Sequence, residues 1–234
     1  MTRGVFVTGT DTGVGKTLAC CALIHAFAAS GVRATPMKPI AAGAVERAGR
    51  WINEDTAALL AAAGIDASAA GLATPILLRE PMAPHIAAQR EGRRITLQPV
   101  AEALAQLEAS GDFLVVEGVG GFRVPLDEGL DTVDLARAIG LPVVLVVGLR
   151  LGCLNHALLT AQAIDASGLE LAGWIANAID PAMAAADENV AALESRLAAP
   201  LLGRLPHAAN PDPRALAAGL DIAPLLAGGK KVSA

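Results

Sequence analysis

Short apolar runs alternate with segments of helical periodicity along the whole chain. The runs are rich in Val, Ile and Leu and predict strands at 5–8, 32–38, 113–117, 142–147, 171–177 and 201–205. The segments between them predict helices at 16–30, 55–63, 97–109, 132–139, 154–167 and 182–197. Strands that are apolar on both faces are typical of a mainly parallel sheet with helices on both sides. We therefore predict an α/β fold.

The chain length of 234 residues fits one α/β domain, and the hydrophobic content of 53% allows a large buried core. No internal repeat and no block of like charges divides the sequence. We predict a single domain over 1–227. The Gly-containing segment 228–234 is expected to be a frayed tail.

Composition narrows the choice of partner and compartment. The net charge of −5 and the aromatic content of 3% disfavour nucleic-acid binding, which depends on basic patches and stacking side chains. The longest apolar run, 141–149, is too short to span a membrane, and no signal peptide is visible. The three cysteines show no zinc spacing and suit a reducing compartment. We expect a cytoplasmic protein that acts on small molecules.

The segment GTDTGVGKT, 9–17, follows a predicted strand and opens a predicted helix, which is the setting of a phosphate-binding P-loop. Backbone N–H groups at a helix N-terminus bind phosphate oxygens. Lys16 is expected at the β- and γ-phosphates and Thr17 at a magnesium ion. The loop is a variant, because Thr10 stands where GxxxxGK[ST] has its first glycine. The alternative is a Gly-rich turn with a chance Lys-Thr pair, which this context disfavours.

A magnesium ion at such a loop needs further oxygen ligands. Glu117 ends an apolar strand and precedes GVGG, 118–121, whose backbone allows close approach of a ligand. We predict that Glu117 contacts metal or nucleotide, rather than being a strand end that meets water. Asp55 starts a predicted helix, and its spacing alone favours a capping role over a metal contact.

Three other polar positions follow predicted strands, where ligands of open α/β sheets bind. Lys38 either meets an anionic substrate or the γ-phosphate, or is a solvated strand end. Gly152, in the segment 151–156, frees N–H groups at a helix start, which form a carboxylate site or a tight turn. Asn177 is placed to read a base, and Ala178 stands where a guanine-reading motif has lysine, so we predict adenine.

Taken together, these motifs resemble the dethiobiotin synthetase family. The matching pieces follow the family order over nearly the whole chain: GTDTGVGKT at Gly9, MKPIAAG at Met37, NED at Asn53, EPMAPHIAAQREG at Glu80, VVEGVGG at Val115, VVGLRLGCLNHALLTAQ at Val146, AGWIAN at Ala172 and LLGRLP at Leu201. The resemblance implies a P-loop NTPase-like fold and a homodimeric, cytoplasmic ligase of biotin biosynthesis. Such enzymes use Mg²⁺ and ATP to close a cyclic urea from 7,8-diaminononanoate and CO₂, releasing ADP and phosphate.

The resemblance also implies residue roles. Those at the nucleotide are Gly13, Val14, Gly15, Lys16, Thr17, Leu18, Glu117, Gly118, Val119, Gly120, Asn177, Pro206, His207 and Ala208. The implied metal ligands are Thr17, Asp55 and Glu117, and the implied catalytic residues are Lys16, Lys38 and Thr12. The implied substrate residues are Thr12, Lys38, Ala42, Leu151, Gly152, Cys153 and Asn155, the last four from the neighbouring subunit.

The sequence departs from relatives at Gly13, which is often acidic, at Ala42, where some have Ser, and at Arg150, which replaces Lys. The first two changes put substrate or nucleotide affinity in question, but not the type of reaction. The main alternative is a partitioning-type P-loop switch ATPase, which usually carries an extra lysine early in the loop. Segment 10–12 reads Thr-Asp-Thr instead. A corrinoid amidase would need a glutamine-hydrolysing domain, for which the chain has no room.

Overall fold

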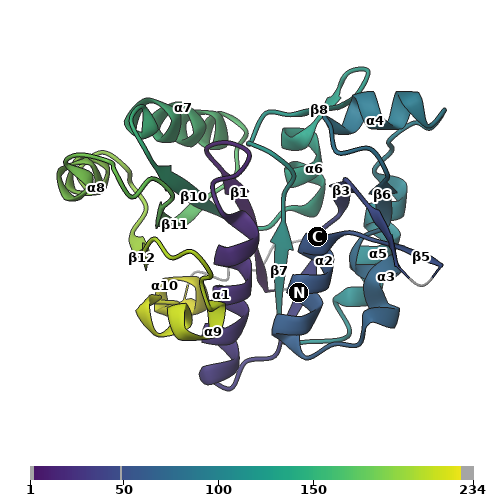
Figure 1. Cartoon of the computed structure of the whole chain (residues 1–234), viewed down its shortest axis with the longest axis horizontal. Helices are drawn as coiled ribbons and strands as arrows, with labels where there is room; N and C mark the ends of the chain where they lie inside the picture. Colours follow the sequence, from purple (N-terminus) through teal and green to yellow (C-terminus); the bar gives the residue numbers. More distant parts are fainter. Residues whose placement is uncertain (1–2, 48, 228–234) are drawn as a thin grey trace.

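A six-stranded sheet lies at the centre of the molecule, shown in Figure 1. The structure is a computed structural model that describes residues 3–47 and 49–227. All neighbouring strands of this sheet run parallel. In spatial order the strands are β12 (Leu201–Leu205), β11 (Leu171–Ala178), β10 (Val143–Leu149), β1 (Gly4–Gly9), β7 (Phe113–Glu117) and β2 (Ala34–Met37).

Successive residues of the strands point to opposite faces, and both faces are buried. On β1, Val5 and Val7 belong to one core cluster and Phe6 to another. The first cluster packs against α1 (Lys16–Ala29), α2 (Glu54–Ala63), α9 (Pro213–Leu216) and α10 (Ala223–Ala227). The other face is covered by α4 (Pro84–Arg90), α5 (Gln98–Leu107), α6 (Thr132–Ile139), α7 (Cys153–Ala166) and α8 (Ala186–Glu194). Burial on both faces explains why the strands read as continuous apolar runs.

Smaller elements border the carboxyl end of the sheet. β3 (Ile40–Ala42) pairs in parallel with β6 (Ile76–Leu78). The hairpins are β4 (Val45–Arg47) with β5 (Arg50–Ile52), and β8 (Pro125–Asp127) with β9 (Leu130–Asp131). Short helices complete the described chain: η1 (Ala67–Ala69), α3 (Ala70–Ala73) and η2 (Ala217–Gly219).

The predicted α/β class, with a mainly parallel sheet and helices on both faces, is confirmed. The strands at 113–117 and 201–205 and the helix at 132–139 have the predicted bounds. The predicted helix at 182–197 was too long: it begins at Ala186, because Ala185 adopts a left-handed conformation with φ of 54°. The predicted domain limit at 227 stays a prediction, and the tail 228–234 lies outside the described residues. Within 3–47 and 49–227, no helix is long and apolar enough to cross a membrane.

The strand order brings three segments that are distant in sequence together at the carboxyl end of the sheet. β1, β7 and β2 are neighbours, with Val7 opposite Glu117 and Met37 opposite Val116. The phosphate loop after β1, Glu117 at the end of β7 and Lys38 after β2 therefore meet at the same rim. This is where ligands of parallel α/β sheets bind.

Candidate active site

The loop between β1 and α1 has the backbone shape of a phosphate-binding loop. Gly13 and Gly15 have φ of 75° and 85°, in the left-handed region that favours glycine. A Cβ on Gly15 would lie 2.1 Å from Asn177 Nδ2, so a side chain there would also clash. The Asn177 amide donates to the carbonyl of Val14 at 2.8 Å and fixes the loop against β11.

Lys16 folds back over this loop. Its ammonium donates to the carbonyl oxygen of Asp11 at 2.9 Å, and the residue is buried. Burial lowers the pKa of Lys16, against the opposing charge of Glu117. The Asp11 carboxylate accepts from the N–H of Thr12 at 2.7 Å and pairs with Arg150 at 2.5 Å. The first half of the loop is thus held by Arg150, which follows β10.

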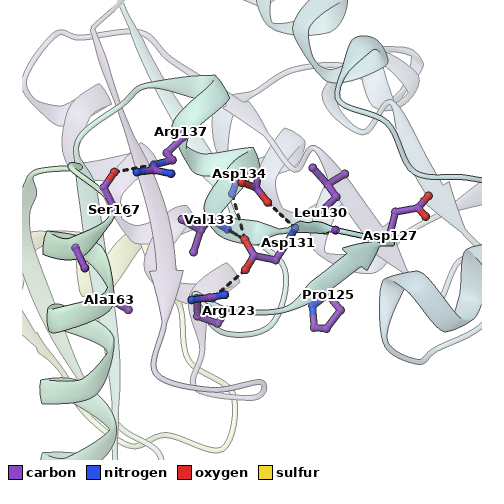
Figure 2. Close-up of a pocket in the computed structure, with 12 residues that line it drawn as sticks. Arg123, Pro125, Asp127, Leu130, Asp131, Val133, Asp134, Arg137, Ala163 and Ser167 are labelled. Atoms are coloured by element: carbon purple, nitrogen blue, oxygen red, sulfur yellow. Dashed lines mark hydrogen bonds and ion pairs between the residues drawn. The ribbon is translucent and has the colours of Figure 1, made fainter.

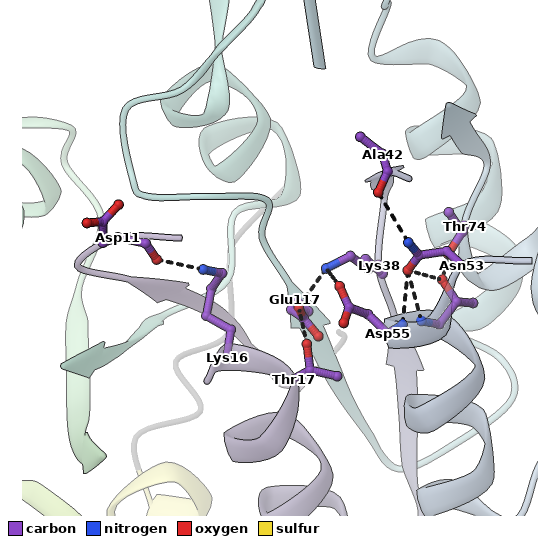
Figure 3. Close-up of polar contacts among 10 residues, drawn as sticks. Asp11, Lys16, Thr17, Lys38, Ala42, Asn53, Asp55, Thr74 and Glu117 are labelled. Carbon is purple, nitrogen blue, oxygen red and sulfur yellow. Dashed lines mark hydrogen bonds and ion pairs between the residues drawn. The ribbon is translucent and has the colours of Figure 1, made fainter. Parts of the chain in front are cut away.

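Lys38 lies at the centre of a cluster of opposite charges, shown in Figure 3. Its ammonium is 2.6 Å from Glu117 Oε1 and 2.9 Å from Asp55 Oδ2. The Thr17 hydroxyl donates to the same Glu117 oxygen at 2.9 Å. The exposed fractions of Lys38 and Glu117 are 4% and 1%, so neither residue is a solvated strand end.

The protonation of this cluster follows from burial and charge. Burial raises the pKa of Glu117, although the ammonium of Lys38 opposes the shift. Burial alone would lower the pKa of Lys38, but the charges of Glu117 and Asp55 together raise it. Burial alone would raise the pKa of Asp55, but the ammonium of Lys38 outweighs this effect and lowers the pKa. Lys38 is therefore held as an ammonium between two acids.

Asp55 does not cap α2, which was the interpretation that spacing alone favoured. Asn53 is the cap: its side-chain oxygen accepts from the N–H groups of Asp55 and Thr56 at 3.1 and 3.2 Å. The carboxylate of Asp55 is thereby free of a capping role and turns toward Lys38 (Figure 3).

The oxygen atoms of this cluster fit a hard divalent cation. Glu117 Oε2 is buried and has no hydrogen-bond partner among the residues that the structure describes. The hydroxyl of Thr17 contacts the other carboxylate oxygen of Glu117. The carboxylate of Asp55 contacts the same Lys38 ammonium as Glu117 does. Alcohol and carboxylate oxygens are the ligands that Mg²⁺ prefers. Across 3–47 and 49–227 there is no group of three or more His, Cys, Asp or Glu side chains that could hold a metal ion, so a cation here would need the Thr17 hydroxyl and ligand or water oxygens besides the two carboxylates.

A cleft of about 650 Å³ opens above the cluster. Its lining includes many residues that the sequence predicted: Thr12, Gly13, Gly15, Lys16, Thr17, Lys38, Ala42, Asp55, Glu117, Val119 and Gly120. The apolar wall of this cleft was not predicted as part of the site; it is formed by Pro81, Met82, Ala83, Pro84 and Val124. The motif that begins at Glu80 contains four of these five residues and was noted only as part of the family resemblance. Apolar side chains alone do not indicate a binding site.

Other predicted site residues lie outside this lining. Leu151 has an exposed fraction of 95% and projects from the surface, while the Cys153 side chain is buried in the core under α7. Cys153 therefore offers only its backbone to a ligand. Pro206, which follows β12, is exposed, and Asn177 lies opposite Leu205 in the sheet register. The segment 206–208 thus lies at the same rim as Asn177, beside the phosphate loop.

A second pocket of about 530 Å³ lies between the β8–β9 hairpin and α7, shown in Figure 2. Its charged groups have partners elsewhere in the protein, both side chains and backbone. Arg123 pairs with Asp131 at 2.8 Å, Asp134 accepts from the Asp131 N–H at 2.9 Å, and Arg137 donates to the carbonyl of Ser167 at 2.7 Å. These contacts cap α6 and join it to α7. The pocket therefore has a structural role, unlike the cleft with its unpartnered Glu117 oxygen.

Comparison with known proteins identifies the family of this chain. The model of a family described as an AAA domain matches residues 3–214. An ATP-dependent dethiobiotin synthetase of Aromatoleum aromaticum is 56% identical over 218 residues, covering 93% of this chain and 96% of that protein. One from Ralstonia nicotianae is 57% identical over 222 residues, covering 95% of this chain and 96% of that protein.

Solved structures share the fold at low identity. The septum site-determining protein MinD with Mg-ADP, from Pyrococcus horikoshii, has a TM-score of 0.53 at 16% identity and covers 88% of this chain and 82% of its own. The receptor FtsY with GDP, from Elizabethkingia anophelis, has a TM-score of 0.51 at 14% identity. It covers 92% of this chain, which spans 59% of the receptor chain. These likenesses show the fold alone, whereas the sequence relatives decide against the switch-ATPase alternative. The chain therefore belongs to the ATP-dependent dethiobiotin synthetase family.

Proposed function

We propose that this protein forms dethiobiotin from 7,8-diaminononanoate and CO₂, with conversion of ATP to ADP and phosphate. The observation that carries the proposal is the contact of the buried Lys38 ammonium with Glu117 and Asp55, at the rim that also holds the phosphate loop. A lysine kept charged beside a phosphate site stabilises the negative charge of a transferring phosphoryl group. Two relatives at 56% and 57% identity are named for this synthesis.

ATP would lie along the loop that joins β1 to α1. The backbone N–H groups of 13–18 face the triphosphate, and Lys16 leaves the carbonyl of Asp11 to contact it. The Gly-rich turn 118–120 borders the same cleft. We place adenine between Asn177 and the segment 206–208, because these lie on neighbouring strand ends beside the loop.

Mg²⁺ would be held by the oxygen atoms of Thr17, Asp55 and Glu117. The unpartnered Oε2 of Glu117 and the donor set support this assignment. When bound, the ion neutralises phosphate charge. The chain's own contribution is to keep these oxygens oriented and Lys38 protonated between them.

The reaction needs positioning and charge neutralisation rather than a protein nucleophile. One amine of the substrate adds CO₂ and loses a proton, giving a carbamate. A carbamate oxygen attacks the γ-phosphorus, and ADP leaves. The second amine then attacks the carbonyl carbon of the mixed anhydride, loses a proton and displaces phosphate as the ring closes. Lys38, Lys16 and Thr12 lie in the cleft lining, where we assign them to the carbamate and the transferring phosphoryl group.

We also propose that the active unit is a cytoplasmic homodimer. Leu151, two residues before α7, has an exposed fraction of 95%, and Leu159 within α7 has one of 56%. Burying such side chains against a second copy removes apolar surface from water. The turn at Leu151, Gly152 and Asn155 would then complete the substrate site of the neighbouring subunit, at the carboxylate tail.

The direct test supplies purified protein with ATP, MgCl₂, bicarbonate and 7,8-diaminononanoate and follows ADP release. We expect ADP release to depend on the diamine, with one dethiobiotin formed per ADP. A chain that hydrolyses ATP at the same rate without diamine would be a switch ATPase, and the proposal would fail. The variant Arg33→Met is the control for the effect of removing a positive charge elsewhere, because the exposed pair of Arg33 with Asp112 lies outside the cleft lining.

A further inference from the structure

A buried polar network lies behind the charged cluster, on the side away from the phosphate loop (Figure 3). Asn53, Thr56 and Thr74 have exposed fractions of 6%, 2% and 5%. Burying three polar side chains costs free energy unless each is hydrogen-bonded.

The network joins the two arms that carry Lys38 and Asp55. The Thr56 and Thr74 hydroxyls are 2.7 Å apart, and Thr56 directly follows Asp55. Thr74 directly follows Ala73, whose carbonyl accepts from the backbone N–H of Lys38 at 2.8 Å. The circle closes at the site, where the Lys38 ammonium meets the Asp55 carboxylate at 2.9 Å.

Asn53 extends the network to the substrate side of the cleft. Its amide donates to the carbonyl of Ala42 at 3.3 Å, and its oxygen accepts from the N–H groups of Asp55 and Thr56. The Thr56 hydroxyl also lies 3.5 Å from that oxygen, and either hydroxyl of the shorter Thr56–Thr74 contact can be the donor. Asn53, Thr56 and Thr74 thus form one connected set of buried polar groups.

We propose that Thr56 and Thr74 are positioning residues that set the separation of Asp55 from Lys38. The inference rests on the proposed function, because it takes Asp55 as a metal ligand. Neither threonine lines the cleft, so neither touches a reacting group. A hydrogen bond between buried hydroxyls resists displacement more strongly than an apolar contact, because breaking it leaves polar atoms unpaired. The network therefore holds α2 at one distance from the start of β3.

The experiment measures Mg²⁺ binding rather than turnover. MgCl₂ is titrated into protein with a fluorescent ADP analogue, and the half-saturating concentration is compared between wild type and Thr74→Val, which keeps the side-chain volume. We expect this concentration to rise on the order of three- to tenfold, as the loss of one hydrogen bond allows. Binding of the analogue without Mg²⁺ should be unchanged. Thr74→Ser, which restores the hydroxyl, should return the wild-type titration.

The controls separate a positioning effect from a loss of stability. Thr35→Val makes the same change at a site 4% exposed at the other end of β2, where the partner is Ser110 at 3.4 Å. It should leave the titration unchanged. If Thr74→Val does not fold, Thr56→Ala removes the same bond from the other side.

The outcomes decide between the two claims. A folded Thr74→Val or Thr56→Ala protein with a lower melting temperature and a wild-type Mg²⁺ titration overturns the inference. A wild-type protein whose nucleotide binding ignores Mg²⁺ contradicts the proposed metal site instead. A weakened titration with rescue by Thr74→Ser supports the inference, whether or not the diamine is the substrate.

Discussion

Removal of one ammonium group tests the charged cluster most sharply. Lys38→Met keeps most of the side-chain length but deletes the cation that lies 2.6 Å from Glu117 and 2.9 Å from Asp55. At an effective dielectric constant of about 20, the contact with the buried Glu117 is an attraction of roughly 6 kcal/mol, and the contact with Asp55, whose side chain is 43% exposed, is weaker because water screens it. Desolvation of the ammonium offsets several kcal/mol of this attraction. Breaking such a buried pair costs about 3–5 kcal/mol, because the Glu117 carboxylate stays behind without an opposite charge, held only by the Thr17 hydroxyl.

Two measurable changes follow. The free energy of unfolding should fall by about 3 kcal/mol, which lowers the melting temperature by on the order of 10 °C in a chain of this size. Turnover should fall by about 10²–10³, the usual effect of losing a preorganised charge contact to the transition state. Differential scanning fluorimetry and the ADP-release assay measure the two effects separately.

The loss of stability should depend on pH. Burial already raises the pKa of Glu117, and loss of the Lys38 charge raises it further. A carboxyl whose pKa is raised by folding stabilises the folded state below its unfolded pKa, and this contribution is lost as pH rises through the folded value. The variant should therefore be closer to wild type in melting temperature at pH 5.5 than at pH 8. Turnover within threefold of wild type, with Arg33→Met as control, would refute the role given to Lys38.

Three further predictions follow from single residues. Gly15→Ala should abolish nucleotide binding in equilibrium dialysis, because its Cβ would lie 2.1 Å from Asn177. Gly31→Ala is the control: its φ is also positive, at 76°, but its Cβ would meet open space, so it should bind nucleotide normally and lose only about 1 kcal/mol of stability. All three cysteines are buried, and burial raises the pKa of Cys21 to about 12, so Ellman's reagent at pH 8 should find no fast thiol until denaturant exposes three. Leu151→Asp should convert the proposed dimer to monomer in sedimentation velocity, and an unchanged dimer would place the interface elsewhere.

The fold was readable from the sequence because its central strands are buried on both faces. The run at 113–117 is apolar up to Glu117, and this one acid at a strand end indicated the rim of the sheet. The hairpins at 45–52 and 125–131 were not predicted. Their strands have two or three residues each, too few to show a period of two.

The candidate site was predicted in part, and the limit is physical. The phosphate loop, Lys38 and Glu117 each follow a strand, so the topology of a parallel sheet was enough to bring them together. Asp55 was misread from its spacing, because Asn53, two residues earlier, serves as the cap. Which of two neighbouring polar residues caps a helix depends on backbone angles that sequence does not show. The Thr56–Thr74 contact joins positions 18 residues apart and had no sequence signal.

The measurement that tests the proposed reaction most directly follows the oxygen atom that the γ-phosphorus accepts. Protein, MgCl₂, ATP and 7,8-diaminononanoate are mixed with freshly dissolved C¹⁸O₂ and quenched within seconds, before the label exchanges with water. A carbamate oxygen that attacks phosphorus leaves with the phosphate when the ring closes, so we predict one ¹⁸O atom in the phosphate formed. Unlabelled phosphate, released while the ADP yield is unchanged, would show that water is the nucleophile and would contradict the account.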